Sequence, residues 1–133
     1  MQLKDLMERC SQMGQLEIPK EFLTGDADYK NNDTAIHLVF CCNMVLSSLC
    51  FQFSKSTEPT CLVALTDQVV LPSVTEWDSR EVEQALCFAV LAEYFLQVQD
   101  FPCFKVWNER AEQALANLRL IKHYKPLPTG RWI

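Results

Sequence analysis

The fold is decided by the stretch from Thr34 to Ser54, which reads TAIHLVFCCNMVLSSLCFQFS. It contains no Asp, Glu, Lys or Arg and is long enough to span a bilayer. Five polar side chains nevertheless interrupt it, at His37, Asn43, Ser47, Ser48 and Gln52. We therefore interpret it as a buried helix of a protein that does not enter the membrane, with Asp33 or Thr34 as its N-cap.

This helix has two apolar faces at 100° per residue. The arc expected to face the core comprises Ala35, Leu38, Val39, Cys42, Val45, Leu46, Leu49 and Phe53. The other half mixes the polar residues with Ile36, Phe40, Cys41, Met44 and Phe51. A small bundle cannot easily cover both faces, so the second face predicts burial against another subunit.

Three more helices are expected around it. Residues 2–13 place Leu3, Leu6, Met7 and Cys10 at helical spacing, and Gly14 is the expected stop. Residues 15–32 are expected to form a loop with one turn around residues 21–23. A helix from Asp78 or Ser79 to about Val98 carries a stripe of small and apolar residues: Ala85, Leu86, Ala89, Ala92 and Leu96.

The last helix is predicted to follow a turn at residues 100–102, with Pro102 at its first position. One side of this helix is predicted to carry residues that repeat at helical spacing: Val106, Trp107, Arg110 or Ala111, Ala114, Leu115, Leu118 and Ile121. Two β-rich runs, at residues 61–65 and 69–71, predict a short hairpin. From residue 122 onward, Pro126 and Pro128 favour an extended conformation.

The predicted fold class is therefore mainly α: a small bundle of about four helices with a short β-hairpin and an extended C-terminal arm. Residues 1–121 are expected to form the helical domain, with the hairpin near residues 60–71, and residues 122–133 to form a docking arm. A length of 133 residues fits one domain, and 49% hydrophobic with 22% charged residues argues against disorder.

Charge is distributed unevenly along the chain. Residues 1–118 hold eight Lys and Arg against all seventeen Asp and Glu, whereas residues 119–133 hold four basic residues and no acid. An acidic body disfavours duplex DNA binding, which needs a cationic face. The basic stretch is expected to dock on protein or to touch nucleic acid.

The seven cysteines are odd in number and irregularly spaced, without a CxxC pair. Together with the lack of a secretory signal pattern at the N-terminus, this predicts free thiols that act as small core hydrophobes in a reducing compartment. A disulfide scaffold is the alternative.

Catalytic chemistry finds little support in the sequence. No GxSxG, HExxH, Walker or EF-hand pattern occurs. His37 and Cys41 have the spacing of two metal ligands on one helix face, but no further thiols stand at ligand spacing, and a core helix is the favoured interpretation. Glu93 is expected to face solvent or to pair across an interface, with Arg110 as the candidate partner. We predict no enzyme, no cofactor and no metal site.

Two sets of residues are the candidate contacts with other chains. The predicted subunit interface comprises Ile36, Phe40, Met44, Phe51, Phe101 and Trp107. The predicted partner-binding residues of the arm comprise Tyr124, Lys125, Leu127, Arg131, Trp132 and Ile133. Lys125 and Arg131 would pair with an acidic partner, since Arg and Trp are enriched at interface hot spots.

Residues 91–115 resemble one tetratricopeptide unit, with Tyr94, the Asp100–Phe101 turn, Ala111 and Ala114–Leu115 at matching places. A solenoid needs about three stacked units, and no second copy is found. The alternative function is therefore a monomeric module that binds a peptide in the groove between its last two helices.

A broader resemblance covers roughly residues 34–133. It rests on NMVLSSL at 43–49, a short β element, AVLAEY at 89–94, VWNERAEQAL at 106–115 and RWI at 131–133. In this set the chain resembles the small head-to-tail adaptor (connector) proteins of tailed bacteriophages and prophages. Its β region is shorter, and its tail holds fewer arginines, than that family leads us to expect.

The resemblance implies a helical protomer of a ring, commonly of twelve copies, beneath the portal protein. The C-terminal segment would reach along the portal or an adjacent ring, and another tail or adaptor protein would lie below. Genome DNA would pass through the lumen without sequence-specific binding, and an acidic lumen would let it slide. The expected location is the virion neck, assembled in the host cytoplasm, with no membrane partner.

Overall fold

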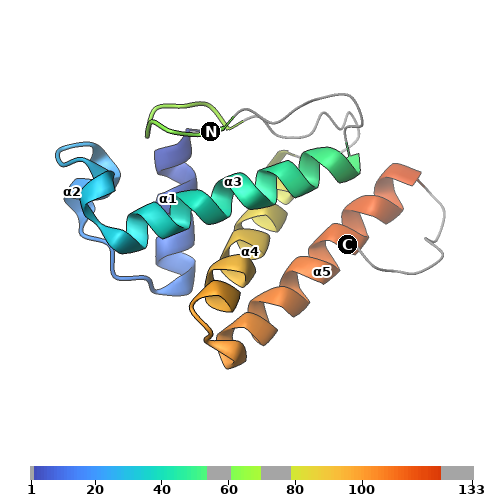
Figure 1. Cartoon of the computed structure of the whole chain (residues 1–133). Coiled ribbons are helices and arrows are strands. Elements are labelled where there is room, and N and C mark those ends of the chain that lie inside the picture. The colour runs from blue at the N-terminus through green and yellow to red at the C-terminus, as the bar shows by residue number, and fades with distance from the viewer. Residues whose placement is uncertain (1, 54–60, 70–78, 124–133) are drawn as a thin grey trace.

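The computed structural model describes residues 2–53, 61–69 and 79–123, and within them it is mainly helical, as predicted. The elements are α1 (Leu3–Gly14), α2 (Lys20–Thr24), a 3-10 turn η1 (Tyr29–Asn31), α3 (Asp33–Phe53), α4 (Ser79–Gln97) and α5 (Phe101–His123) (Figure 1). Each of the four longer helices agrees with a predicted helix to within a few residues. The turn expected around residues 21–23 is α2.

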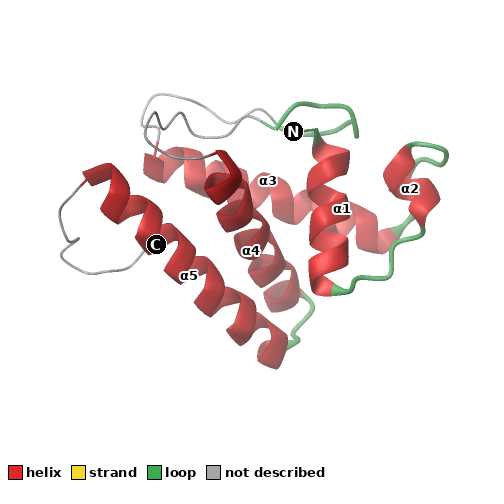
Figure 2. Ribbon diagram, turned by 180° about the vertical axis from the view of Figure 1, so that it is seen from behind, coloured by secondary structure: helices red, strands yellow, loops and turns green. Residues whose placement is uncertain are grey.

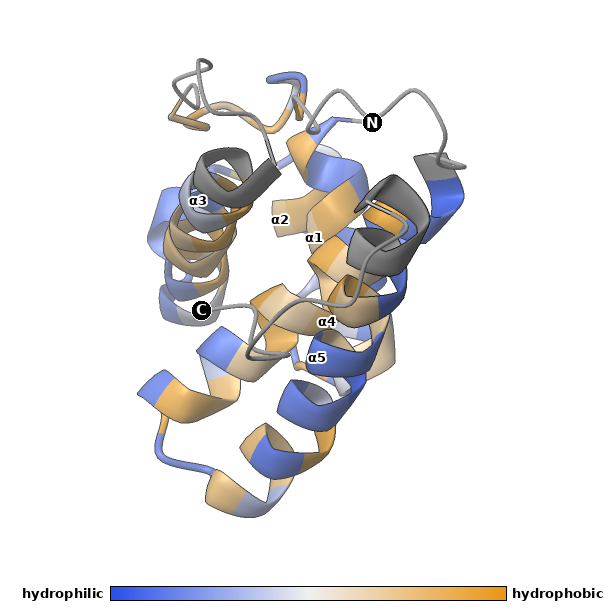
Figure 3. Ribbon diagram, turned by 90° about the vertical axis from the view of Figure 1, so that its right-hand side faces the viewer, coloured by the Kyte–Doolittle hydropathy of each residue, from blue (hydrophilic) through white to orange (hydrophobic). Residues whose placement is uncertain are grey.

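Helix α4 lies in the middle of the molecule. α5 runs antiparallel along one side of it, α1 lies on the other side, and α3 crosses one face (Figures 1 and 2). Apolar residues concentrate on the sides of these helices that face one another (Figure 3). The core therefore lies among α1, α3 and α4, with α5 closing one flank of α4.

The predicted inward arc of α3 is confirmed over its described side chains. None of these seven residues is more than 7% exposed: Ala35, Leu38, Val39, Cys42, Val45, Leu46 and Leu49. The N-cap, however, is Asn32 rather than Asp33 or Thr34, because the Asn32 Oδ1 atom accepts a hydrogen bond from the Ala35 backbone N–H at 2.9 Å. A polar side chain one residue earlier thus satisfies one of the free amides of the first turn.

Helix α1 buries the face that its spacing predicts, with Leu3, Leu6, Met7 and Cys10 fully buried. Gly14 is its last residue, but the left-handed position beyond it belongs to Gln15, whose φ is 53°. Gly14 serves packing instead: a Cβ atom there would lie 2.6 Å from Leu91 Cδ2. The glycine lets the end of α1 approach α4 closely.

The predicted hairpin is wrong for residues 61–69, the part of it that the structure describes. Residues 61–69 form a turn and contain no strand; their one β-bridge joins Gln68 to Gln2. The carbonyl oxygens of Leu65 and Asp67 accept hydrogen bonds from the backbone N–H groups of Lys4 and Leu3. The β-rich segment therefore caps the start of α1 instead of pairing with residues 69–71, of which 70 and 71 lie outside the described residues.

Three side chains hold this capping loop, defined as residues 61–69. Asn43 of α3 makes two hydrogen bonds to the backbone of Leu62, and the Tyr29 hydroxyl donates to the Val63 carbonyl. Within the loop, Asp67 Oδ2 accepts from the backbone N–H groups of Val63 and Ala64 at 2.8 and 2.9 Å. These side chains fix the loop against α1 and α3.

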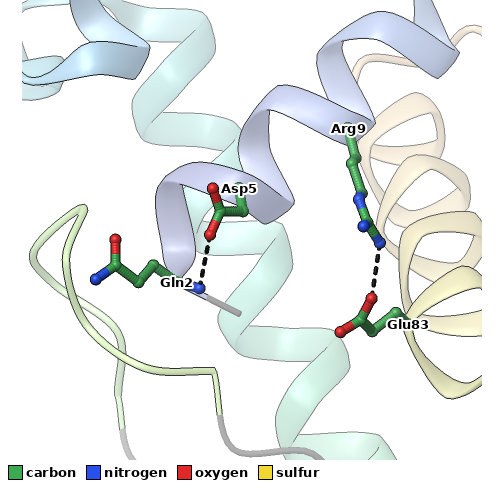
Figure 4. A network of polar contacts seen from close by, with 4 residues as sticks. All are labelled: Gln2, Asp5, Arg9 and Glu83. Atoms are coloured by element: carbon green, nitrogen blue, oxygen red, sulfur yellow. Dashed lines mark hydrogen bonds and ion pairs between the residues drawn. The ribbon is translucent and has the colours of Figure 1, made fainter. Parts of the chain in front are cut away.

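A polar contact joins α1 to the first half of α4 (Figure 4). Arg9 Nη1 lies 2.8 Å from Glu83 Oε2, with Arg9 about half exposed. At the start of α1, Asp5 Oδ2 accepts a hydrogen bond from the Gln2 backbone N–H at 3.0 Å. Both contacts lie at the surface, so the α1–α4 packing depends on the apolar residues beneath them.

The extended arm was predicted to begin at residue 122, but α5 continues through His123. Residues 124–133 lie outside the described residues. Asp100 is the N-cap of α5, since its Oδ1 accepts from the Cys103 N–H at 3.3 Å, so Phe101 rather than Pro102 is the first helical residue.

Candidate functional site

A row of exposed apolar side chains follows the outer face of α3. Ile36, Phe40 and Met44, which we name the α3 stripe, are 41%, 54% and 43% exposed. They stand four residues apart, so they lie along one side of the helix. Cys41, predicted for the same outer face, is instead fully buried. The stripe holds three of the predicted subunit-interface residues together; the Phe51 side chain lies outside the described residues.

A polar network borders the α3 stripe and ties α3 to α4. Gln97 donates from Nε2 to Glu93 Oε1 at 2.9 Å and to Met44 Sδ at 3.3 Å. Its Oε1 atom faces His37 Nε2. Because an amide oxygen can only accept, His37 must carry its proton on Nε2. One glutamine thus fixes the edge of the stripe and the orientation of the histidine.

His37 has an aromatic neighbour as well: its ring centroid lies 5.2 Å from that of Tyr94. Cys41, one turn further along α3, has its pKa raised to about 12 by burial and, secondarily, by the charge of Glu93. It is therefore a neutral thiol at ordinary pH. The described residues contain no group of three or more His, Cys, Asp or Glu placed to hold a metal ion.

Two of the other cysteines form a hydrogen-bonded pair, and the hydrogen bond from Cys10 lowers the pKa of Cys87. Cys10 and Cys87 meet between α1 and α4; donation of the Cys10 S–H to Cys87, together with burial, raises the pKa of Cys10 well above its usual value. Burial also raises the pKa of Cys42. Six cysteines with described side chains are free thiols: Cys10, Cys41, Cys42, Cys61, Cys87 and Cys103. Four of them are buried, which agrees with the predicted role in core packing.

The second predicted interface region lies at the turn between α4 and α5. Phe101 is 58% exposed, and Leu96 and Val98 nearby are 41% and 43% exposed. Leu96 was predicted to belong to the inward stripe of α4, and this prediction is wrong. The other four members of that stripe are buried. In Figure 1 this turn lies at the lower end of the molecule, with α3 crossing above it.

Trp107, a predicted interface residue, packs against side chains of its own chain. Its ring packs on Phe88 of α4 with the centroids 5.9 Å apart, and the Arg110 guanidinium carbon lies 4.7 Å from its ring centroid. Such a cation–π contact contributes about 0.5–1 kcal/mol at an exposed site. Within one chain Arg110 therefore contacts Trp107, and Glu93 accepts a hydrogen bond from Gln97. A pair between Glu93 and Arg110 across an interface stays a prediction.

A groove runs between α4 and α5 on the side that carries Phe88. This α4–α5 groove has a volume of about 580 Å³, which falls in the range of ligand pockets. It is lined by Gln84, Phe88, Val106, Glu109, Arg110, Gln113, Ala114 and Asn117. Three of these lining residues are apolar, Phe88, Val106 and Ala114, and the other five are polar and include one acidic and one basic side chain.

All six predicted partner-binding residues of the arm lie outside the described residues. Sequence reasoning also missed the residues that organise the surfaces, above all Gln97 and Asn43. Asn43 carried a usable signal, since an amide in an uncharged apolar helix needs a partner when it faces other protein. Gln97 had no such signal, because it stands at the end of α4 among other glutamines.

Comparison with known proteins adds no relative: no family model, no curated protein and no solved structure matches the chain. None of the helices formed by the described residues has the length and hydropathy needed to cross a bilayer.

Proposed function

We propose that the protein is a non-enzymatic virion component, a head-to-tail adaptor whose copies form a ring between the portal protein and the tail. The observation that carries the proposal is the α3 stripe. A helix with one fully buried face leaves Phe40 54% exposed on the other, with Ile36 and Met44 beside it. Full burial of a large apolar side chain is worth about 1.5–3 kcal/mol. Covering the stripe with a neighbouring copy would therefore stabilise an assembly.

The apolar residues of the α4–α5 turn support the same conclusion. Phe101 is exposed at one end of the molecule, while the stripe follows another helix. Two separate apolar surfaces on one protomer suit the head-to-tail contacts of a ring, in which each copy offers different surfaces to its two neighbours. Each contact would have to bury more than about 1,000 Å².

Charge suits the proposed DNA passage. Residues 2–53 carry seven acidic and four basic side chains, so the body repels phosphate, and DNA would slide past without adhering. The basic stretch from residue 119 onward would contact protein: the portal, or another adaptor or tail protein. The ring would be assembled in the host cytoplasm and remain in the neck of the virion.

Co-purification with a portal protein tests this proposal. The tagged chain is co-expressed with the portal protein encoded in the same genome, and the captured complex is imaged by electron microscopy. We expect rings of adaptor stacked on portal rings. If the co-expressed chain purifies as a monomer and captures no portal protein, the proposal is overturned.

The second candidate is a monomeric peptide-binding module, and the α4–α5 groove is the observation that favours it. The groove lies between the last two helices, where the resemblance to a tetratricopeptide unit places a peptide. Light scattering separates the two functions when portal is present: the module remains a single chain, whereas the adaptor joins a multi-copy particle.

A further inference from the structure

We propose that the α4–α5 groove receives residues 124–133 of a second copy, with Trp132 against the apolar lining residues Phe88, Val106 and Ala114 and Arg131 beside Glu109. This inference rests on the proposed function, because it names the neighbour that the C-terminal segment binds within the ring. The groove is the acceptor, and a peptide of this chain's own sequence is the ligand.

The groove has the chemistry of an aromatic anchor site. Phe88 is half-buried and in ring contact with Trp107, and Val106 is 47% exposed. Ala114 adds a small apolar side chain to the lining. A large aromatic ring laid against these side chains buries apolar area at low entropic cost, which is why Trp dominates interface hot spots. The ten residues after α5 contain one tryptophan, Trp132.

The acidic residue of the groove lining complements the basic residue beside that tryptophan. Glu109 is exposed and has no ion-pair partner among the described residues, whose one ion pair joins Arg9 to Glu83. Arg110, the basic residue of the lining, is turned onto Trp107. Residues 124–133 contain two basic residues and no acidic one. An arginine placed next to the anchoring tryptophan would therefore meet an unpaired carboxylate.

The lengths also agree. Ten residues in an extended, proline-containing conformation span about 30 Å. The groove follows α5 from residue 106 to residue 117, a distance of about 17 Å along a helix. A segment of this length can thus lie along the whole groove and leave about 13 Å to reach from the neighbouring copy.

Photo-crosslinking in the full chain tests the inference. Position 132 carries p-benzoylphenylalanine, an aromatic replacement for Trp132, and this chain is mixed with a larger, tagged copy that lacks the probe. We expect a crosslinked product of one small and one tagged chain, with the attachment on Phe88, Val106 or Ala114 by mass spectrometry. Attachment within a single chain, on a portal protein or elsewhere on the second copy would overturn the inference, as would no attachment.

Two variants of the tagged copy sharpen the result. Val106→Lys places a charge in the groove and should lower the crosslink yield by about tenfold. Val63→Lys is the matched control, because Val63 is exposed to a similar degree, 51%, but lines neither the groove nor the apolar surfaces of α3 and the α4–α5 turn. It should leave the yield unchanged, and an equal loss from both variants would contradict the groove.

Charge exchange adds a test with rescue. Arg131→Glu in the probe chain should lower the yield by about fivefold, the value of a partly exposed ion pair, and Glu109→Lys in the tagged copy should restore it. The outcome is separable from that of the proposed function. Rings on portal without groove crosslinks overturn this inference alone, whereas groove crosslinks between copies that never capture portal overturn the adaptor function alone.

Discussion

Asn43 binds the backbone of Leu62 as a neighbouring strand would, through both hydrogen-bonding groups of its side chain. Its Nδ2 atom donates to the Leu62 carbonyl at 3.0 Å, and its Oδ1 atom accepts from the Leu62 N–H at 2.7 Å. Leu62 itself is 2% exposed. A single side chain of α3 thus positions the loop that caps α1.

Replacement of Asn43 by Ala should therefore destabilise the protein strongly. Two backbone groups beside a buried residue would lose their partners, each at a cost of about 1–3 kcal/mol, so we expect a loss of about 2–4 kcal/mol. Urea unfolding followed by circular dichroism measures it. Ser47→Ala, at an exposed position of the same helix, is the control and should change stability by less than about 0.5 kcal/mol. Equal effects from the two variants would contradict the role of Asn43.

The Asp67 carboxylate should make the capping loop sensitive to acid. Hydrogen bonds from the backbone N–H groups of Val63 and Ala64 lower the pKa of Asp67 below its usual value of 3.8. A depressed folded-state pKa stabilises the protein above the unfolded-state value, and this contribution is lost as the pH falls through the folded-state pKa. Stability of the wild type should therefore fall more steeply below about pH 4 than that of Asp67→Asn. Parallel curves for the two proteins would refute the assignment.

The ion pair between Arg9 and Glu83 should matter little. Arg9 is about half exposed, and exposed pairs contribute about 0–1 kcal/mol. Glu83→Gln should therefore cost less than about 1 kcal/mol, and the difference from wild type should shrink in about 1 M salt, where the Debye length is about 3 Å. Unfolding at two salt concentrations, with Glu81→Gln on the same helix as control, measures this. A larger cost that persists in salt would show that the α1–α4 packing depends on the pair.

Thiol labelling should separate the cysteines by burial. Cys61 is exposed and Cys103 is half-buried, whereas Cys10, Cys41, Cys42 and Cys87 are buried. A hydrogen bond with Asp100 raises the pKa of Cys103, so Cys61 should react first and Cys103 second with a maleimide at neutral pH. The four buried thiols should react only as the whole protein unfolds. Site-resolved mass spectrometry follows each cysteine, and rapid labelling of Cys41 or Cys42 would contradict the position of α3 in the core.

The helices could be predicted because apolar periodicity alone specifies a buried face. Leu3, Leu6, Met7 and Cys10 repeat at helical spacing and are all buried. The inward arc of α3 was predictable for the same reason. The capping loop was not, because its β-rich composition predicts pairing within the segment, whereas its carbonyl oxygens are taken by the free N–H groups of α1. That contact is long-range, and no local pattern contains it.

The candidate surfaces were likewise predictable only where the apolar pattern of a single helix specifies them. Exposure of Phe40 and Met44 followed from a helix with more apolar surface than a small bundle can cover. The polar border of the stripe did not, since Gln97 meets His37 only after α3 has crossed α4. Arg110 lies over the aromatic ring of Trp107, three residues earlier on the same helix, and the charge pattern alone does not predict this contact.

Phe40→Glu should leave the protomer intact while removing its assembly. Because Phe40 is 54% exposed, the substitution should change the free energy of unfolding by no more than about 0.5 kcal/mol. A charge at the centre of a buried interface would nevertheless be costly. Thermal unfolding checks the first point, with Met13→Glu as the control at an exposed apolar position of α1, outside the α3 stripe. A large loss of stability would mean that Phe40 belongs to the protomer core.

The proposed ring depends most on the α3 stripe being covered by another copy of the chain in the particle. Native mass spectrometry of the tagged chain, co-expressed with the portal protein of its own genome, tests this directly. For the wild type and Met13→Glu we predict a complex that holds many adaptor copies and the portal, and for Phe40→Glu a folded single chain. A wild-type chain that remains single in the presence of portal, or a Phe40→Glu chain that assembles as the wild type does, would contradict the proposed ring.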